Sequence, residues 1–272
     1  GFEVEYPALG IPTAFTARCG RGGGPKVAIL TEYDALPEIG HACGHCASGS
    51  LSLLAALALH ECADLVPANI DIIGTPDEEA TGKKIEMAEA GLFDKYDFVI
   101  MIHMDSKNKA EMKLLALSAF HYNFRGQPAH ASACPWAGKN ALNGAMLMIH
   151  GFDMMRQHLK PTTRVHGIII RGGEASNIVP EYASAEYTFR SPDSRYLAQV
   201  VKLLHDCAKG AAMATQTSVE IVKYAPSLDS MKPNPAGTAM LEEIFAAQGL
   251  PVFKGEDENI GSSDIGNVSF RC

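Results

Sequence analysis

Three short apolar runs, each followed by a cluster of chemically active side chains, constrain the fold of this chain more than any other feature. They cover residues 26–30, 69–74 and 98–102, with helix-like segments at 47–60 and 83–90 between them. Strands that alternate with helices predict βαβ units and a mostly parallel sheet. The carboxyl ends of parallel strands meet at one edge of such a sheet, where ligands bind. We therefore expect the three polar clusters to lie close together.

The side chains in these clusters are of the types that bind zinc or manganese. Cys43 and His45 follow the first strand on the loop that leads into a helix, Glu78 and Glu79 follow the second, and His103 follows the third. Thiolate, imidazole and carboxylate are good ligands for a borderline metal. A Cys-Gly-His triplet alone would more simply be a buried thiol and a satisfied histidine. The three clusters together predict a metal site with one acid left over to act as a base.

Longer motifs surround these residues and continue along nearly the whole chain. In order they are Asp34-Ala35-Leu36-Pro37, Gly40-His41-Ala42-Cys43-Gly44-His45, Pro76-Asp77-Glu78-Glu79, His103, Gln127-Pro128-Ala129-His130-Ala131-Ser132, and Gly172-Gly173 through Asn177. The set resembles the co-catalytic metallopeptidases and amidohydrolases, a family that includes aminoacylases, glutamate carboxypeptidases and auxin-conjugate hydrolases. Its nearest branch is that of aminobenzoyl-glutamate hydrolases and aminoacylase-like dipeptidases. Cys46 departs from that branch, which usually has Asp or Asn there.

The resemblance implies two divalent metal ions, manganese or zinc. Cys43 would bridge them as a thiolate, with His45 and His103 on one ion and Glu79 on the other. The family's last ligand is a histidine near the C-terminus, but no histidine follows His205 in this sequence. We therefore expect a chain that is incomplete at both ends, with two ions in the full-length protein and one or none in the 272-residue form.

The resemblance also assigns roles outside the metal ligands. Glu78 is the implied general base and acid, and Asp34 is the implied second acid that orients a ligand histidine. His130 and Asn177 match positions that hold the substrate carbonyl and its oxyanion, so His130 counts as catalytic. Arg190 matches a position that can bind the substrate's terminal carboxylate in a bidentate pair. Each of these could instead be an ordinary surface or turn residue.

The periodicity changes near residue 115 and indicates a second domain. The expected elements are strands at 114–124, 164–171, 182–190 and 218–224 and helices at 140–158 and 194–213. Their order, βαββαβ, is that of the split βαβ, ferredoxin-like fold. We therefore predict an α/β protein in which residues 115–226 form an inserted α+β lid or dimerisation domain. Residues 1–114 and 227–272 would form the metal-binding catalytic domain, with strands at 11–18 and 251–253 among its elements.

Composition excludes two classes of partner. A formal charge of −8 without a basic cluster argues against nucleic acid, and no apolar stretch is long enough to span a membrane. Seven scattered cysteines in a chain of this size favour a reduced, cytoplasmic protein. The remaining partners are a small substrate and, by resemblance, a second copy in a homodimer.

These observations predict a metal-dependent amidohydrolase. It would cleave an N-acyl, N-aroyl or peptide amide bond next to a free carboxylate, in an N-acyl amino acid or a molecule of the aminobenzoyl-glutamate type. A dipeptidase of the same family is the nearest alternative. A non-catalytic relative that binds an amino acid or peptide is the alternative from another class, and Cys46 and the absent histidine keep it open.

Overall fold

The computed structural model describes residues 2–18, 23–255 and 260–272, which form two compact units. The first unit comprises Gly1–Lys113 and Met231–Cys272, and the second comprises Leu114–Ser230. No helix in the described ranges is both long and apolar enough to cross a membrane.

The first unit is built on a five-stranded mixed sheet in the order β1-β2-β4-β3-β5. Its strands are β1 (Glu3–Glu5), β2 (Phe15–Arg18), β3 (Lys26–Thr31), β4 (Asn69–Gly74) and β5 (Phe98–Met101). The three strands that precede the polar clusters, β3, β4 and β5, run parallel as predicted. Their carboxyl ends therefore share one edge. β1 and β2 add an antiparallel ribbon at the other side of the sheet.

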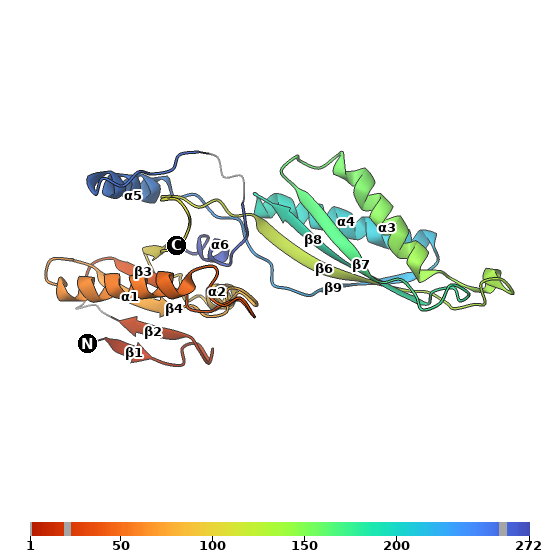
Figure 1. The fold of residues 1–272 in the computed structure, drawn as a ribbon, viewed down its shortest axis with the longest axis horizontal. Helices are drawn as coiled ribbons and strands as arrows, with labels where there is room; N and C mark the ends of the chain where they lie inside the picture. The colour runs from red at the N-terminus through yellow and green to blue at the C-terminus, as the bar shows by residue number, and fades with distance from the viewer. Residues whose placement is uncertain (1, 19–22, 256–259) are drawn as a thin grey trace. The chain divides into compact units, whose positions relative to one another are not determined.

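Helices complete this unit (Figure 1). They are α1 (His45–Glu61), α2 (Lys83–Glu89), α5 (Pro235–Ala247) and α6 (Ile265–Val268). The small side chain of Ala56 packs α1 onto the sheet, against Ile29 of β3 and Ile72 of β4. β3 and β4 are parallel neighbours, so α1 must carry the chain back from the end of β3 to the start of β4. The carboxyl ends of both strands therefore lie at the same edge of the sheet as the first residue of α1.

The second unit is a four-stranded antiparallel sheet in the order β7-β8-β6-β9. Its elements are β6 (Ala116–Arg125), a short 3₁₀ helix at Pro135–Ala137, α3 (Ala141–Arg156), β7 (Arg164–Arg171), β8 (Tyr182–Ser191), α4 (Ser194–Ala214) and β9 (Ser218–Lys223). Two features of the prediction are confirmed: the chain is α/β in class, and this unit has the βαββαβ element order.

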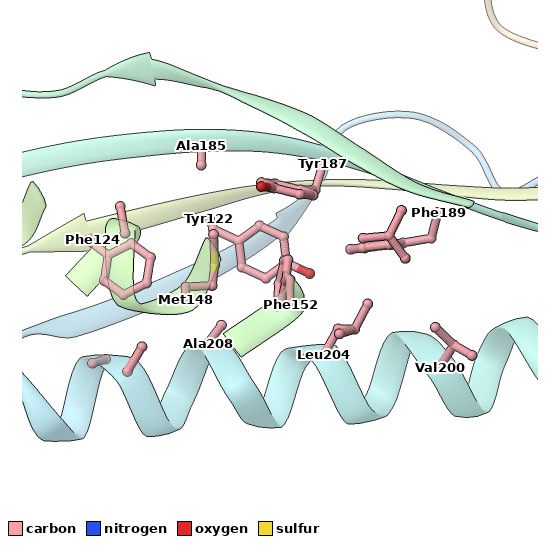
Figure 2. Close-up of a cluster of buried hydrophobic side chains, with 14 of the residues drawn as sticks. Tyr122, Phe124, Met148, Phe152, Ala185, Tyr187, Phe189, Val200, Leu204 and Ala208 are labelled. Atoms are coloured by element: carbon pink, nitrogen blue, oxygen red, sulfur yellow. The ribbon is translucent and has the colours of Figure 1, made fainter. Parts of the chain in front are cut away.

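The core of the second unit lies between the sheet and its two helices. Figure 2 shows aromatic side chains of β6 and β8 above the small and aliphatic residues of α4. Phe152 of α3 stands edge-on to Tyr187 with ring centroids 5.0 Å apart, and also packs near Tyr122 at 5.6 Å. These contacts give the second unit a hydrophobic core of its own, as an independent domain requires.

The structure corrects three details of the sequence prediction. β2 begins only at Phe15, because the preceding segment turns through backbone hydrogen bonds from the Ile11 N–H to the Ala8 carbonyl and from the Ala14 N–H to the Ile11 carbonyl. Residues 251–253 form no strand, although the Phe253 N–H donates to the Asn108 carbonyl. Residues 227–230 group with the second unit, not the first. Leu228 explains the shift, since its backbone pairs with Leu117 through two hydrogen bonds of 2.9 and 3.0 Å.

Candidate metal centre

Two glycines at the start of α1 allow it to approach closely the residues that follow β5 and β3. Gly44 has φ of +77°, and a Cβ there would lie 2.8 Å from Met104 Cγ. A Cβ on Gly49 would lie 2.4 Å from the Glu32 carbonyl oxygen. Only glycine permits this approach. His45, the first helical residue, is therefore placed directly beside the residues that follow β3.

The hydrogen bonds of His45 and His103 fix which ring nitrogen carries the proton. His45 Nδ1 lies 3.1 Å from Asp34 Oδ1, and His103 Nδ1 lies 2.9 Å from the Met104 carbonyl oxygen. A carboxylate and a carbonyl can only accept, so each Nδ1 is the donor. In the neutral rings both Nε2 atoms then present a lone pair. This is the arrangement of metal-ligating histidines, whose other nitrogen donates to an oxygen.

Several acceptor atoms converge with no donor between them. Glu32 Oε2 lies 3.5 Å from His45 Nε2 and 4.0 Å from His103 Nε2. Glu79 Oε1 lies 4.0 Å from His45 Nε2. Among the described residues, Glu32 Oε2 and His45 Nε2 are buried without any hydrogen-bond partner. Unpartnered buried acceptors are costly, and a cation among them removes the cost. The residues present therefore fit a divalent metal.

The two adjacent glutamates after β4 differ in their surroundings. The Glu79 backbone N–H donates to Asp34 Oδ2 at 3.0 Å, which links the second polar cluster to the first. At Glu78, desolvation raises the pKa of the carboxyl above the ordinary value, against a hydrogen bond from Ser263 that lowers it. A raised pKa makes Glu78 a stronger base than an ordinary glutamate.

Cys43 is half-buried beside the same cluster. A hydrogen bond to Glu79, with burial as the second cause, raises the pKa of its thiol to about 11. Among the described residues, three groups each bring their potential ligand atoms within 4.8 Å of one another, and Cys43 is in none of these groups. Metal bridging by Cys43 therefore remains a prediction. Cys46 is exposed in the first turn of α1.

Three charged residues that have no role in the sequence prediction, Glu32, Lys84 and Asp264, form an ion triad at this cluster. Lys84 Nζ donates to Glu32 Oε1 at 2.6 Å and to Asp264 Oδ1 at 2.8 Å. The Lys84 backbone N–H donates to Asp264 Oδ2 at 3.0 Å. All three side chains are buried. The available signal in the sequence was Glu32, an acid directly after an apolar strand.

The other predicted site residues belong to the second unit, where the structure brings two of them together. His130 and Ile178 form an isolated β-bridge, and the Ala131 N–H donates to the Asn177 carbonyl at 2.9 Å. His130 Nδ1 accepts from the Ala133 N–H at 3.3 Å. Its Nε2 is then the protonated, exposed donor. Arg190 lies on β8, opposite Leu117 and Arg164.

An α/β unit with a buried set of carboxylates and imidazoles at its strand ends, joined to a ferredoxin-like unit, defines a class: metal-dependent hydrolases of linear amides. Comparison with known proteins agrees. Residues 116–215 match the model of the peptidase dimerisation domain. This match begins with β6 and ends just after α4.

Curated relatives extend the similarity to the rest of the chain. It is 38% identical to the Xaa-Arg dipeptidase of Mus musculus, over 99% of this chain and 67% of the relative. It is 29% identical to one component of the p-aminobenzoyl-glutamate hydrolase of Escherichia coli, over 94% of this chain and 57% of the relative. The chain therefore spans about two thirds or less of these proteins' lengths.

Solved structures share the fold. An aminobenzoyl-glutamate utilization protein from Klebsiella pneumoniae superimposes with a TM-score of 0.76 at 24% identity, covering 96% of this chain and 67% of that one. A dinuclear metal-binding peptidase of the M20 family from Bacillus subtilis gives 0.74 at 21% identity, covering 97% and 74%. The chain belongs to the M20 family of peptidases and amidohydrolases, and the family predicted from its motifs is confirmed.

Proposed function

We propose that this protein hydrolyses the amide bond of a small linear substrate that carries a free carboxylate beside that bond. The observation that carries the proposal is the convergence of unpartnered buried acceptors, Glu32 Oε2 and His45 Nε2, with the base Glu78 close by. Amide hydrolysis at neutral pH needs an activated nucleophile and a proton shuttle, and this cluster contains residues suited to both.

Two divalent ions, manganese or zinc, would be held by Cys43, His45, Glu79 and His103, and when bound they supply an acidified water and a polarised carbonyl. Asp34 keeps His45 in the tautomer that leaves Nε2 free, and it also accepts from the Glu79 N–H. A single carboxylate thus orients one ligand from α1 and one from the end of β4. Such supporting hydrogen bonds set the direction and basicity of ligands.

Glu78 is the proposed proton carrier. Desolvation raises its pKa, so its carboxylate is a better proton acceptor than an exposed glutamate. It takes the proton from the nucleophilic water at its carboxylate oxygen and returns it to the leaving nitrogen. The neighbouring Glu79 is positioned by the hydrogen bond from its backbone N–H to Asp34, and its carboxylate would bind metal.

The second unit would supply the groups that hold the substrate. With Nδ1 occupied by backbone N–H donors, His130 offers Nε2–H to a carbonyl oxygen that gains charge in the transition state. Asn177 lies in the turn just before Ile178, whose backbone is bridged to His130, and would serve the same oxygen. Arg190 would pair with the terminal carboxylate. The match to a peptidase dimerisation domain supports a homodimer, and the cytoplasmic location remains a prediction from the sequence.

Dipeptides with a basic C-terminal residue are the favoured substrates. Relatives named Xaa-Arg dipeptidase are 38% and 36% identical over 99% of this chain, against 29% for the aminobenzoyl-glutamate hydrolase component. The formal charge of −8 also favours approach of a cationic substrate over an anionic one. N-acyl amino acids are the second candidate, because a relative at 28% identity is an N-acetyl-L-cysteine deacetylase.

A substrate panel tests this proposal. The protein, with manganese or zinc added, is incubated with dipeptides ending in Arg, Lys, Glu or Leu, with aminobenzoyl-glutamate and with N-acetyl amino acids. We expect the highest kcat/KM for the dipeptides ending in Arg or Lys. Preference for aminobenzoyl-glutamate or acetylated substrates would move the assignment to the second candidate. Substrate binding without metal and without hydrolysis would identify a non-catalytic relative.

A further inference from the structure

The two carboxylate oxygens of Glu32 have different surroundings. Oε1 accepts a 2.6 Å hydrogen bond from Lys84 Nζ, whereas Oε2 has no hydrogen-bond partner and faces His45 Nε2 at 3.5 Å. The side chain has no exposed surface, so water from bulk solvent does not reach it. The hydrogen bond from Lys84 to Oε1 therefore fixes the orientation of the carboxylate and the direction in which Oε2 points.

The charges around Glu32 do not balance within the protein. Two buried carboxylates, Glu32 and Asp264, share the single buried ammonium of Lys84. One negative charge remains in a region removed from solvent, and an unpaired buried charge is strongly unfavourable. The uncompensated charge lies on the side of Oε2, toward the two histidines.

The distances around Oε2 suit a shared ion. Glu32 Oε2 is 3.5 Å from His45 Nε2 and 4.0 Å from His103 Nε2. Ligand atoms about 2.0–2.1 Å from a tetrahedral ion are about 3.4 Å from one another, so small side-chain adjustments close the site. Glu32 directly follows β3, His103 follows β5 and His45 begins α1, and all three belong to one compact unit.

We propose that Glu32 is itself a ligand of the metal centre, through Oε2, and that Lys84 and Asp264 are positioning residues that hold this carboxylate. The proposal rests on the metal-dependent function above and adds a ligand that lies outside the set drawn from the family motifs. The ion held by His45 and His103 would then have a carboxylate ligand. The buried ion triad of Glu32, Lys84 and Asp264 would orient that ligand.

Metal affinity, not activity, is the primary measurement. Zinc and manganese dissociation constants are determined by competition with a chromophoric chelator, and bound metal is counted after dialysis, for the wild type and Glu32→Gln. Loss of a supporting partner typically weakens metal binding about 10- to 100-fold, so loss of a direct ligand should exceed about 100-fold. Glu32→Gln preserves side-chain size and one hydrogen-bond acceptor for Lys84.

Two matched variants separate the role of a ligand from that of a structural acid. Asp264→Asn removes the other buried carboxylate on Lys84 but leaves Glu32 in place, so metal affinity should fall by no more than the roughly 10- to 100-fold of a supporting partner. Glu186→Gln removes a carboxylate that pairs with His121 at 3.0 Å in the second unit, and it should leave the metal affinity unchanged. Circular dichroism checks that each variant is folded.

The outcomes distinguish this inference from the proposed function. Equal loss of affinity in Glu32→Gln and Asp264→Asn would mean that Glu32 acts only in the ion triad, and unchanged affinity in Glu32→Gln would also overturn its assignment as a ligand. Either result leaves the metal-dependent function intact. Failure of the full-length wild type to bind zinc or manganese would instead overturn the proposed function.

Discussion

Replacing Lys84 by Met tests how far the buried ion triad stabilises the first unit. The Lys84 ammonium is fully buried, 2.6 Å from Glu32 Oε1 and 2.8 Å from Asp264 Oδ1. Methionine has similar length and no charge, so the change leaves two buried carboxylates without a counterion. Removing one partner of a buried ion pair costs about 3–5 kcal/mol. A factor of ten in an equilibrium constant corresponds to about 1.4 kcal/mol. The protection of the slowest-exchanging backbone amides against hydrogen exchange should therefore fall by about two to four powers of ten.

Hydrogen exchange with mass spectrometry measures this loss separately in each unit. We expect faster exchange in β3 and β4 of Lys84→Met, while β6 and β8 of the second unit serve as an internal reference. The neighbouring lysine gives the control: Lys83 pairs with Glu86 at 2.8 Å on the exposed face of α2. Such an exposed pair is worth about 0.2–0.5 kcal/mol. Unchanged protection in Lys84→Met, or an equal loss in Lys83→Met, would refute the reasoning.

Three further predictions concern single side chains. Glu78→Gln should retain the metal and lose about two to four powers of ten in turnover, and loss of metal would make Glu78 a ligand instead. Cys43→Ser should lower metal content and activity together while Cys46→Ala leaves metal content near normal, and equal effects would show that the wrong cysteine was assigned. Burial lowers the pKa of His205 below its ordinary value of 6.5, so the stability it contributes is present above that pH and is lost as the pH falls. Urea unfolding should therefore show a larger drop in stability from pH 7 to 5 for the wild type than for His205→Leu, and equal drops would contradict the sign.

Much of the fold follows from local pattern. The strands at 69–74 and 164–171 have the predicted bounds, because turn residues flank apolar runs of strand length. The parallel arrangement of β3, β4 and β5 follows from the intervening helices. Residues 251–253 read as a strand for the same reason, yet no neighbouring strand pairs with them among the described residues. A single apolar run cannot show whether a partner strand is available to complete its hydrogen bonds.

The site divides in the same way. Its chemistry was readable in the sequence, since ligand-type residues that directly follow parallel strands must gather at one sheet edge whatever the rest of the chain does. The burial of Lys84 was not, because α2 spans only Lys83–Glu89 and two adjacent lysines in so short a helix show no clear periodicity. Folding decided which of the two turned inward, and it brought Asp264 to Lys84 from 180 residues away. Contacts at that separation depend on how whole elements pack, and therefore only the tertiary structure could show that Glu32 is held facing the histidines.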